Sequence, residues 1–76
     1  MNTLDQVIQI VADCLNLSPS IIDKESSANN IDIWDSMAQV NLMIALEQSF
    51  DIELEVEDFM KLNSVQAITD YLDAKL

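Results

Sequence analysis

Residues 36–50 read Ser-Met-Ala-Gln-Val-Asn-Leu-Met-Ile-Ala-Leu-Glu-Gln-Ser-Phe, with no proline or glycine among them. Apolar residues recur in this stretch at the i, i+3, i+4 and i+7 spacing that gathers side chains on one face of an α-helix. The residues that make the pattern are Met37, Val40, Met43, Ile44, Leu46 and Phe50. The stretch therefore predicts an amphipathic helix whose apolar face packs on a core.

Two other long segments have the same spacing. The first contains Leu4, Val7, Ile8, Val11, Cys14 and Leu15, and the last contains Val65, Ile68, Tyr71 and Leu72 after an N-cap at Asn63 or Ser64. A short helix is predicted at residues 57–62. Because the 76-residue chain has no glycine and one proline, tight hairpin turns are disfavoured. We expect one all-α domain over residues 1–76, a small four-helix bundle of three long helices and one short helix.

The connections between these helices are also readable. Residues 18–35 form a long loop between the first two helices; it opens with Ser18 and Pro19, a plausible helix cap and first-turn proline. We expect this loop to be pinned down by its isoleucines, which are Ile21, Ile22, Ile31 and Ile33. Residues 50–56 alternate apolar and acidic residues as a strand would, but no second run could pair with them, so we predict a loop there.

The charge of the chain restricts its partners. Three Lys and fourteen Asp and Glu give a formal net charge of -11, which disfavours binding to the phosphate backbone of nucleic acids. Such a surface favours basic patches on other proteins. The chain starts without a basic segment, and its longest apolar run, residues 42–46, is too short to span a membrane. We expect a cytoplasmic monomer.

Most catalytic chemistry is excluded by composition. Histidine is absent, and the single cysteine, Cys14, lies among apolar residues of the first helix, where it is expected to be buried. No Ser-His-Asp triad or common zinc site can therefore be assembled. The acids at residues 51–57 resemble a calcium loop, but Val56 and Leu62 stand where glycine and glutamate are needed. We predict no metal site, no catalytic residue and no enzymatic activity of the chain itself.

What remains is a hydroxyl at the start of a helix. Unpaired backbone N–H groups there would stabilise an anion attached to Ser36. Ser36 and Gln39 also fit the capping-box pattern of ordinary helix starts. Spacing alone favours the cap.

The tripeptide Asp35-Ser36-Met37 resembles the Asp-Ser-Leu motif of the acyl carrier protein family. The resemblance extends over nearly the whole chain, through Val40, Leu42, Ala45, Leu46, Glu47, Phe50, Asp51, Ser64-Val65 and Asp70-Tyr71-Leu72. It implies that a phosphopantetheinyl transferase attaches 4'-phosphopantetheine from coenzyme A to Ser36, and that the thiol of this arm carries cargo as a thioester. Asp35 and Met37 would support recognition by the transferase, which in the family uses the carboxylate together with a metal ion. Family cargo can enter between the helices, here past Val40, Ile44, Phe59 and Ile68.

Departures from the family pattern bear on the partners. The second helix has Glu47 as its one acid, whereas the family's fatty-acid carriers present several there. Much of the charge lies instead at residues 51–58 and in the long loop, at Asp23, Glu25, Asp32 and Asp35. We therefore expect a dedicated set of partner enzymes with basic patches, acyl ligases or synthases, that contact Trp34, Val40, Asn41 and Glu47. Trp34 could instead anchor the loop, and its burial distinguishes the two roles.

Three functions follow in order of preference. The first is a carrier of acyl thioesters in a specialised acyl, lipid or polyketide pathway. The second is a D-alanyl or peptidyl carrier, because Met37 and the neutral second helix leave aminoacyl cargo open. The third, from a different class, is an unmodified acidic helical adaptor domain, in which Ser36 only caps a helix.

Overall fold

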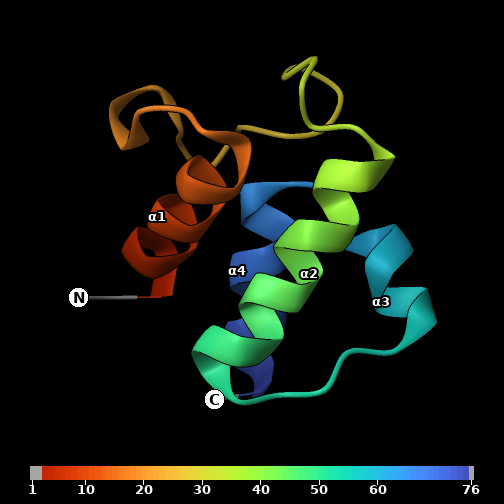
Figure 1. Ribbon diagram of the computed structural model, residues 1–76. Helices are drawn as coiled ribbons and strands as arrows, with labels where there is room; N and C mark the ends of the chain where they lie inside the picture. Colours follow the sequence, from red (N-terminus) through yellow and green to blue (C-terminus); the bar gives the residue numbers. More distant parts are fainter. Residues whose placement is uncertain (1–2, 76) are drawn as a thin grey trace.

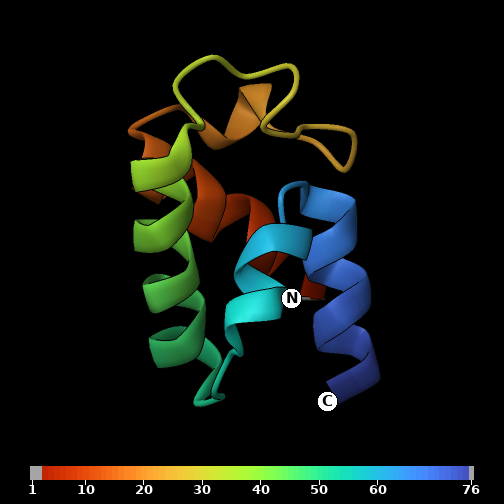
Figure 2. The same ribbon diagram turned by 90° about the vertical axis from the view of Figure 1, so that its right-hand side faces the viewer.

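The computed structural model describes residues 3–75 and shows an α-helical bundle (Figure 1). Its helices are α1 (Thr3–Leu15), α2 (Ser36–Phe50), α3 (Val56–Lys61) and α4 (Val65–Lys75). A single 3-10 turn, η1 (Pro19–Ile21), lies in the long loop between α1 and α2. In Figure 2, α2 and α4 stand on either side of the bundle, with α1 behind them and the short α3 in front. The predicted four-helix bundle of three long helices and one short helix is confirmed.

The core lies between the three long helices. Each contributes side chains with no exposed surface: Val7, Val11, Ala12, Leu42, Met43, Leu46, Val65 and Ile68. Burial of such side chains contributes roughly 1.5–3 kcal/mol each, against a large loss of conformational entropy. The short α3 has no fully buried residue of its own. The three long helices therefore form the stable frame on which α3 is placed.

The core-facing side of α2 agrees with the predicted one at Met43 and Leu46 but not at Met37, Val40 and Ile44. Leu42, Met43 and Leu46 face the interior, whereas Met37 is 76% exposed and Val40 and Ile44 are 46% and 44% exposed. Apolar residues lie on two sides of this helix, and both sets have helical spacing. The register of the core is decided by packing against α1 and α4. Met37, Val40 and Ile44, one, two and three turns into the helix, are left as an exposed apolar stripe.

The long loop is attached to the beginning of α4. The backbone N–H of Ala28 donates to Asn63 O at 2.9 Å, and Val65 N–H donates to Ser26 O at the same distance. The second bond satisfies one of the N-terminal N–H groups of α4 that have no partner within the helix. Of the isoleucines expected to pin this loop, Ile22 is buried and Ile31 half-buried, but Ile21 and Ile33 are exposed. The prediction for these last two was wrong, because backbone bonds and Trp34 hold the loop instead.

Local capping defines the ends of the loop and of α4. Ser18 caps η1 as predicted, accepting from the N–H of Ser20 at 3.3 Å, and Pro19 is its first residue. Of the two candidate caps for the last helix, Ser64 is the one used, since its Oγ accepts from Ala67 N–H at 3.0 Å. Such a side-chain cap stabilises a helix by about 1 kcal/mol.

Residues 51–55 form a loop, as expected, rather than a strand. Asp51 ends α2 in the left-handed region with φ 54°, a conformation that aspartate tolerates better than most residues. Further along, the N–H of Leu54 donates to Glu47 Oε2 at 2.9 Å. The next helix begins at Val56 and ends at Lys61, one residue earlier at each end than predicted, with Glu55 N–H donating to Asp58 Oδ2 at 3.0 Å.

Cys14 lies partly exposed on α1 rather than fully buried as expected. Burial, and to a smaller extent the neighbouring Asp13 carboxylate, raises the pKa of its thiol above the ordinary value. A raised pKa lowers the thiolate fraction at neutral pH, and the thiolate is the reactive form. Cys14 is therefore a packing residue with a slow thiol. Within residues 3–75, no helix is both long and apolar enough to cross a membrane.

We expect Ser64→Ala to destabilise the fold by about 1 kcal/mol, because Ala67 N–H loses its cap. Urea unfolding followed by circular dichroism measures this loss. Ser49→Ala, at an exposed position of α2, is the matched control and should leave stability nearly unchanged. Equal stability of the two variants would contradict the assigned cap.

Candidate functional site

The exposed Ser36 is the first residue of α2, and the cap of this helix is its neighbour. Asp35 has extended backbone geometry and its Oδ1 accepts from Ala38 N–H at 2.9 Å. The expected Ser36–Gln39 capping box is therefore wrong. Both residues before Met37 are good N-caps, and the structure uses the carboxylate, which also interacts favourably with the positive end of the helix dipole.

Because Asp35 caps the helix, the Ser36 hydroxyl is not needed as a cap. Among residues 3–75, no side chain or backbone group is hydrogen-bonded to its Oγ. Helix N-termini stabilise attached or bound anions through unpaired N–H groups, typically by 0.3–1 kcal/mol at an exposed site. A phosphodiester at this oxygen would not have to break an existing contact of the fold.

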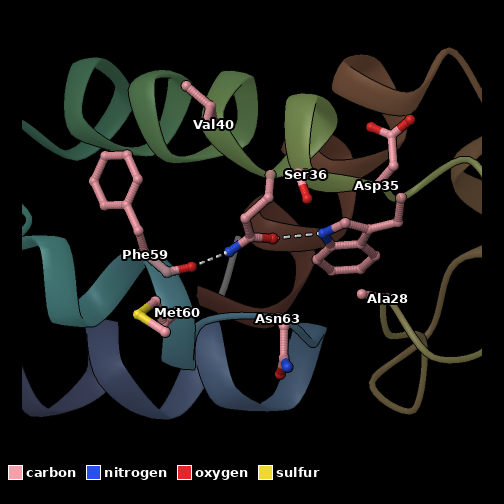
Figure 3. A pocket seen from close by; sticks show the side chains of 9 residues that line it. Ala28, Asp35, Ser36, Val40, Phe59, Met60 and Asn63 are labelled. Atoms are coloured by element: carbon pink, nitrogen blue, oxygen red, sulfur yellow. Dashed lines mark hydrogen bonds between the residues drawn. The ribbon is translucent and has the colours of Figure 1, made fainter.

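A groove of about 540 Å³ opens beside Ser36 (Figure 3). It runs between the start of α2 and the end of α3. Its lining consists of Ala28, Trp34, Asp35, Ser36, Gln39, Val40, Phe59, Met60 and Asn63. Most of its surface is apolar, with amide groups of Gln39 and Asn63 among the apolar side chains. The groove can therefore accept a flexible chain that has both apolar and amide segments.

The side chain of Gln39 joins the walls of this groove. Its Oε1 accepts from Trp34 Nε1–H at 2.6 Å, and its Nε2 donates to Phe59 O at 2.9 Å and to Leu62 O at 2.7 Å. Two dashed lines in Figure 3 mark the bonds to the indole and to the Phe59 carbonyl. We call these three hydrogen bonds the Gln39 bridge.

Two residues predicted to contact partners make contacts within the fold, which contradicts the partner role of Trp34 and leaves that of Glu47 a prediction. Trp34 is only 2% exposed, so it anchors the loop and does not belong to a partner surface. The carboxylate of Glu47 is half-buried and accepts from Leu54 N–H, which fixes the chain after α2. Asn41 and Val40 are exposed on α2 as predicted.

The predicted acyl-cavity residues separate into two groups. Val40 and Phe59 line the groove, but Ile44 lies further along the exposed stripe and Ile68 is completely buried in the core. Neither Ile44 nor Ile68 lines the groove. Val40, Phe59 and Met60 are the apolar side chains of α2 and α3 that line the groove, and the role of Ile44 and Ile68 in an acyl cavity stays a prediction.

Sequence reasoning missed the importance of Gln39, Met60 and Asn63. Met60 and Asn63 lie on either side of the end of α3, and no spacing pattern relates them to Ser36. Gln39 was considered as the partner of Ser36 in a capping box. A polar residue at a half-buried helix position beside a tryptophan is the one local signal of its role.

The chain matches the family described as "Phosphopantetheine attachment site" over residues 5–72, a span that includes Ser36. It is 35% identical over 74 residues to an acyl carrier protein of Thermosynechococcus vestitus, covering 96% of this chain and 90% of that protein. It is 36% identical over 77 residues to an acyl carrier protein of Buchnera aphidicola, with 99% and 96% covered.

A solved structure is similar over the whole fold. The solution structure of a holo acyl carrier protein from Geobacter metallireducens has a TM-score of 0.83 and 33% sequence identity, covering 99% of this chain and 86% of that one. The helical architecture, the sequence matches and the family match over the exposed serine agree. The chain is a member of the acyl carrier protein family, whose members are carriers rather than enzymes and bear a phosphopantetheine prosthetic group.

Proposed function

We propose that Ser36 carries the 4'-phosphopantetheine arm and that the chain holds acyl groups on it as thioesters for a specialised acyl, lipid or polyketide pathway. The observation that carries this proposal is the exposed Ser36 hydroxyl, which has no hydrogen-bond partner among the described residues and borders the groove. An adaptor that used Ser36 only as a cap would need this hydroxyl to bond the helix. Asp35 performs that task, so the adaptor alternative loses its main support.

Asp35 and Met37 would serve the transferase. Asp35 engages Ala38 N–H through one oxygen, Oδ1, and remains exposed beside Ser36. Its carboxylate would hold the metal ion that the transferase uses during transfer from coenzyme A. Met37 is 76% exposed and adjoins the reacting hydroxyl in sequence, so it would contact the transferase through apolar packing.

Partner enzymes would dock on the exposed apolar stripe of α2, formed by Met37, Val40 and Ile44. Asn41 lies on the same exposed part of the helix. Acidic residues precede α2 in the long loop and follow it before α3. A partner that complements this surface would therefore have an apolar patch with a basic rim. Because α2 itself has a single acid, which is used internally by Leu54, this surface would discriminate against partners that need several acids on that helix. We also propose that the carrier acts in the cytoplasm as a monomer, with this stripe reserved for enzymes.

We expect Ser36→Ala to abolish modification. Intact mass spectrometry after incubation with coenzyme A and a broad-specificity phosphopantetheinyl transferase should show one added phosphopantetheine on the native chain and none on the variant. Because Asp35 forms the cap, the free energy of unfolding of the variant should lie within about 0.5 kcal/mol of that of the native chain. Ser49→Ala is the control and should be modified fully. An unmodified native chain would overturn the proposal.

Asp35→Asn separates the two roles of that residue. Asparagine is as good an N-cap as aspartate, so stability should change by only a few tenths of a kcal/mol beyond the lost charge–dipole attraction. The rate of phosphopantetheine transfer should fall at least tenfold, because the variant lacks the carboxylate that would hold the metal. The measurement is a time course by intact mass. A normal rate would show that the carboxylate serves only as a cap.

The class of cargo is decided by loading the modified protein with ligases. We expect a fatty acyl ligase to form a thioester on the arm and an aminoacyl ligase specific for D-alanine to form none. Thiol labelling provides an internal check, because the arm should react fast and Cys14 slowly. Loading by the aminoacyl ligase alone would favour the second alternative, the aminoacyl carrier.

A further inference from the structure

The Gln39 bridge uses the full hydrogen-bonding capacity of the two N–H groups of this amide. The acceptors on α3 are Phe59 O, within the helix, and Leu62 O, at its C-cap. The last carbonyls of a helix have no partner within it, so they need an external donor. The bridge therefore satisfies the end of α3 from α2, across 20 and 23 residues of sequence.

α3 packs on the core through Phe59 and through Leu62 at its C-cap, but among the described residues its only hydrogen bonds to α2 come from Gln39. It is six residues long, which is too short for independent stability, and none of its residues is fully buried. The side-chain hydrogen bond that joins α3 to α4 is donated by the Tyr71 hydroxyl to Asp58 Oδ2 at 3.0 Å. Widening the space between α2 and α3 would consequently require breaking both bonds from Gln39 Nε2.

The room for a cargo lies outside the Gln39 bridge. The groove of about 540 Å³ is bordered by Ser36, Val40 and Met60, with Gln39 also in its lining. Toward the interior, Leu42, Met43 and Ile68 have no exposed surface and belong to the packed core. A chain attached at Ser36 therefore meets the groove before it meets the core.

We infer that Gln39, supported by Trp34, closes the space between α2 and α3 and confines the cargo to the surface groove. This inference rests on the proposed function, since it requires an arm on Ser36. The bridge then acts as a specificity-determining element. Short acyl groups and the amide-containing arm fit the groove, whereas a long acyl chain extends past it into solvent and gains no protection from the protein.

The test is a series of cargoes of increasing length. The transferase attaches acetyl-, butanoyl-, octanoyl- or dodecanoyl-4'-phosphopantetheine from the corresponding coenzyme A thioester, with release of adenosine 3',5'-bisphosphate, and intact mass verifies each product. Absence of any product would refute attachment and thus the proposed function. Given full loading, the melting temperature, the rate of thioester cleavage by hydroxylamine and the Ile68 methyl resonances are measured for each length.

In the native chain we expect all three readouts to be the same from butanoyl to dodecanoyl. Gln39→Ala should make them depend on length. Octanoyl cargo should raise the melting temperature of this variant by about 4–8 °C over acetyl cargo, because a ligand bound inside stabilises only the folded state. It should also slow thioester cleavage and shift the Ile68 methyl resonances.

Matched variants keep the result interpretable. Trp34→Phe retains a buried ring but removes the Nε1–H donor, and Gln39→Glu retains the size of the side chain but removes both donors to α3. Both should show part of the length dependence, which keeps the test open if Gln39→Ala folds poorly. Gln48→Ala, at an exposed site on the same helix, should behave as the native chain. Length-dependent protection in the native chain, or none in any loaded bridge variant, would overturn the inference.

Discussion

The half-buried amide of Gln39 determines the shape of the region around Ser36. It bonds an indole from the long loop and two backbone carbonyls at the end of α3, segments that share no other described side-chain bond. Each such bond contributes a net 0.5–1.5 kcal/mol, but a half-buried amide left without partners costs about 1–3 kcal/mol. The three hydrogen bonds are thus mutually dependent, because loss of one makes the bonded position of the Gln39 side chain less stable and so weakens the other two.

This dependence gives the molecule two levels of organisation. The packed faces of α1, α2 and α4 form a core that fixes α2 and with it the direction of Ser36. The walls of the groove are added by the long loop and α3, which are held by a few buried side chains, such as Trp34 and Leu62, together with hydrogen bonds. Segments held in this way open at lower free energy than a packed core. The site therefore combines a fixed position for the Ser36 hydroxyl with walls that would open more easily than the core, as the proposed function requires.

The sequence predicted the number and the order of the helices because their apolar spacing is local information. It predicted the orientation of α2 only in part, since Met43 and Leu46 are buried whereas Val40 and Ile44 are exposed. Leu42 and Met43 have neighbours in Val40 and Ile44 that are equally apolar, so helical spacing alone permits two core faces. Only the shape of α1 and α4 discriminates between them.

In the candidate site too, features set by adjacent residues could be predicted, whereas features set by distant contacts could not. Ser36 was identified from a motif of adjacent residues, together with the resemblance it carries. The choice between Asp35 and Ser36 as the cap could not be made, because both side chains cap helices well and differ by one position. Gln39 escaped notice since its acceptors are 20 and 23 residues away and are backbone oxygens, which the sequence does not identify. Contacts of this kind are determined by the fold as a whole.

The exposed apolar stripe on α2 and the net charge of -11 have consequences that fit together. Large exposed apolar side chains on a domain of this size favour self-association. A high net charge opposes it, because two copies repel each other as their stripes approach. The same charge would attract a basic partner and speed its encounter, while the proposed contact with Met37, Val40 and Ile44 would set how long the complex lasts. Under the proposed function, a carrier that visits several enzymes needs fast association from its acids and only moderate apolar contact, and the separation of acids from the α2 stripe would supply the two independently.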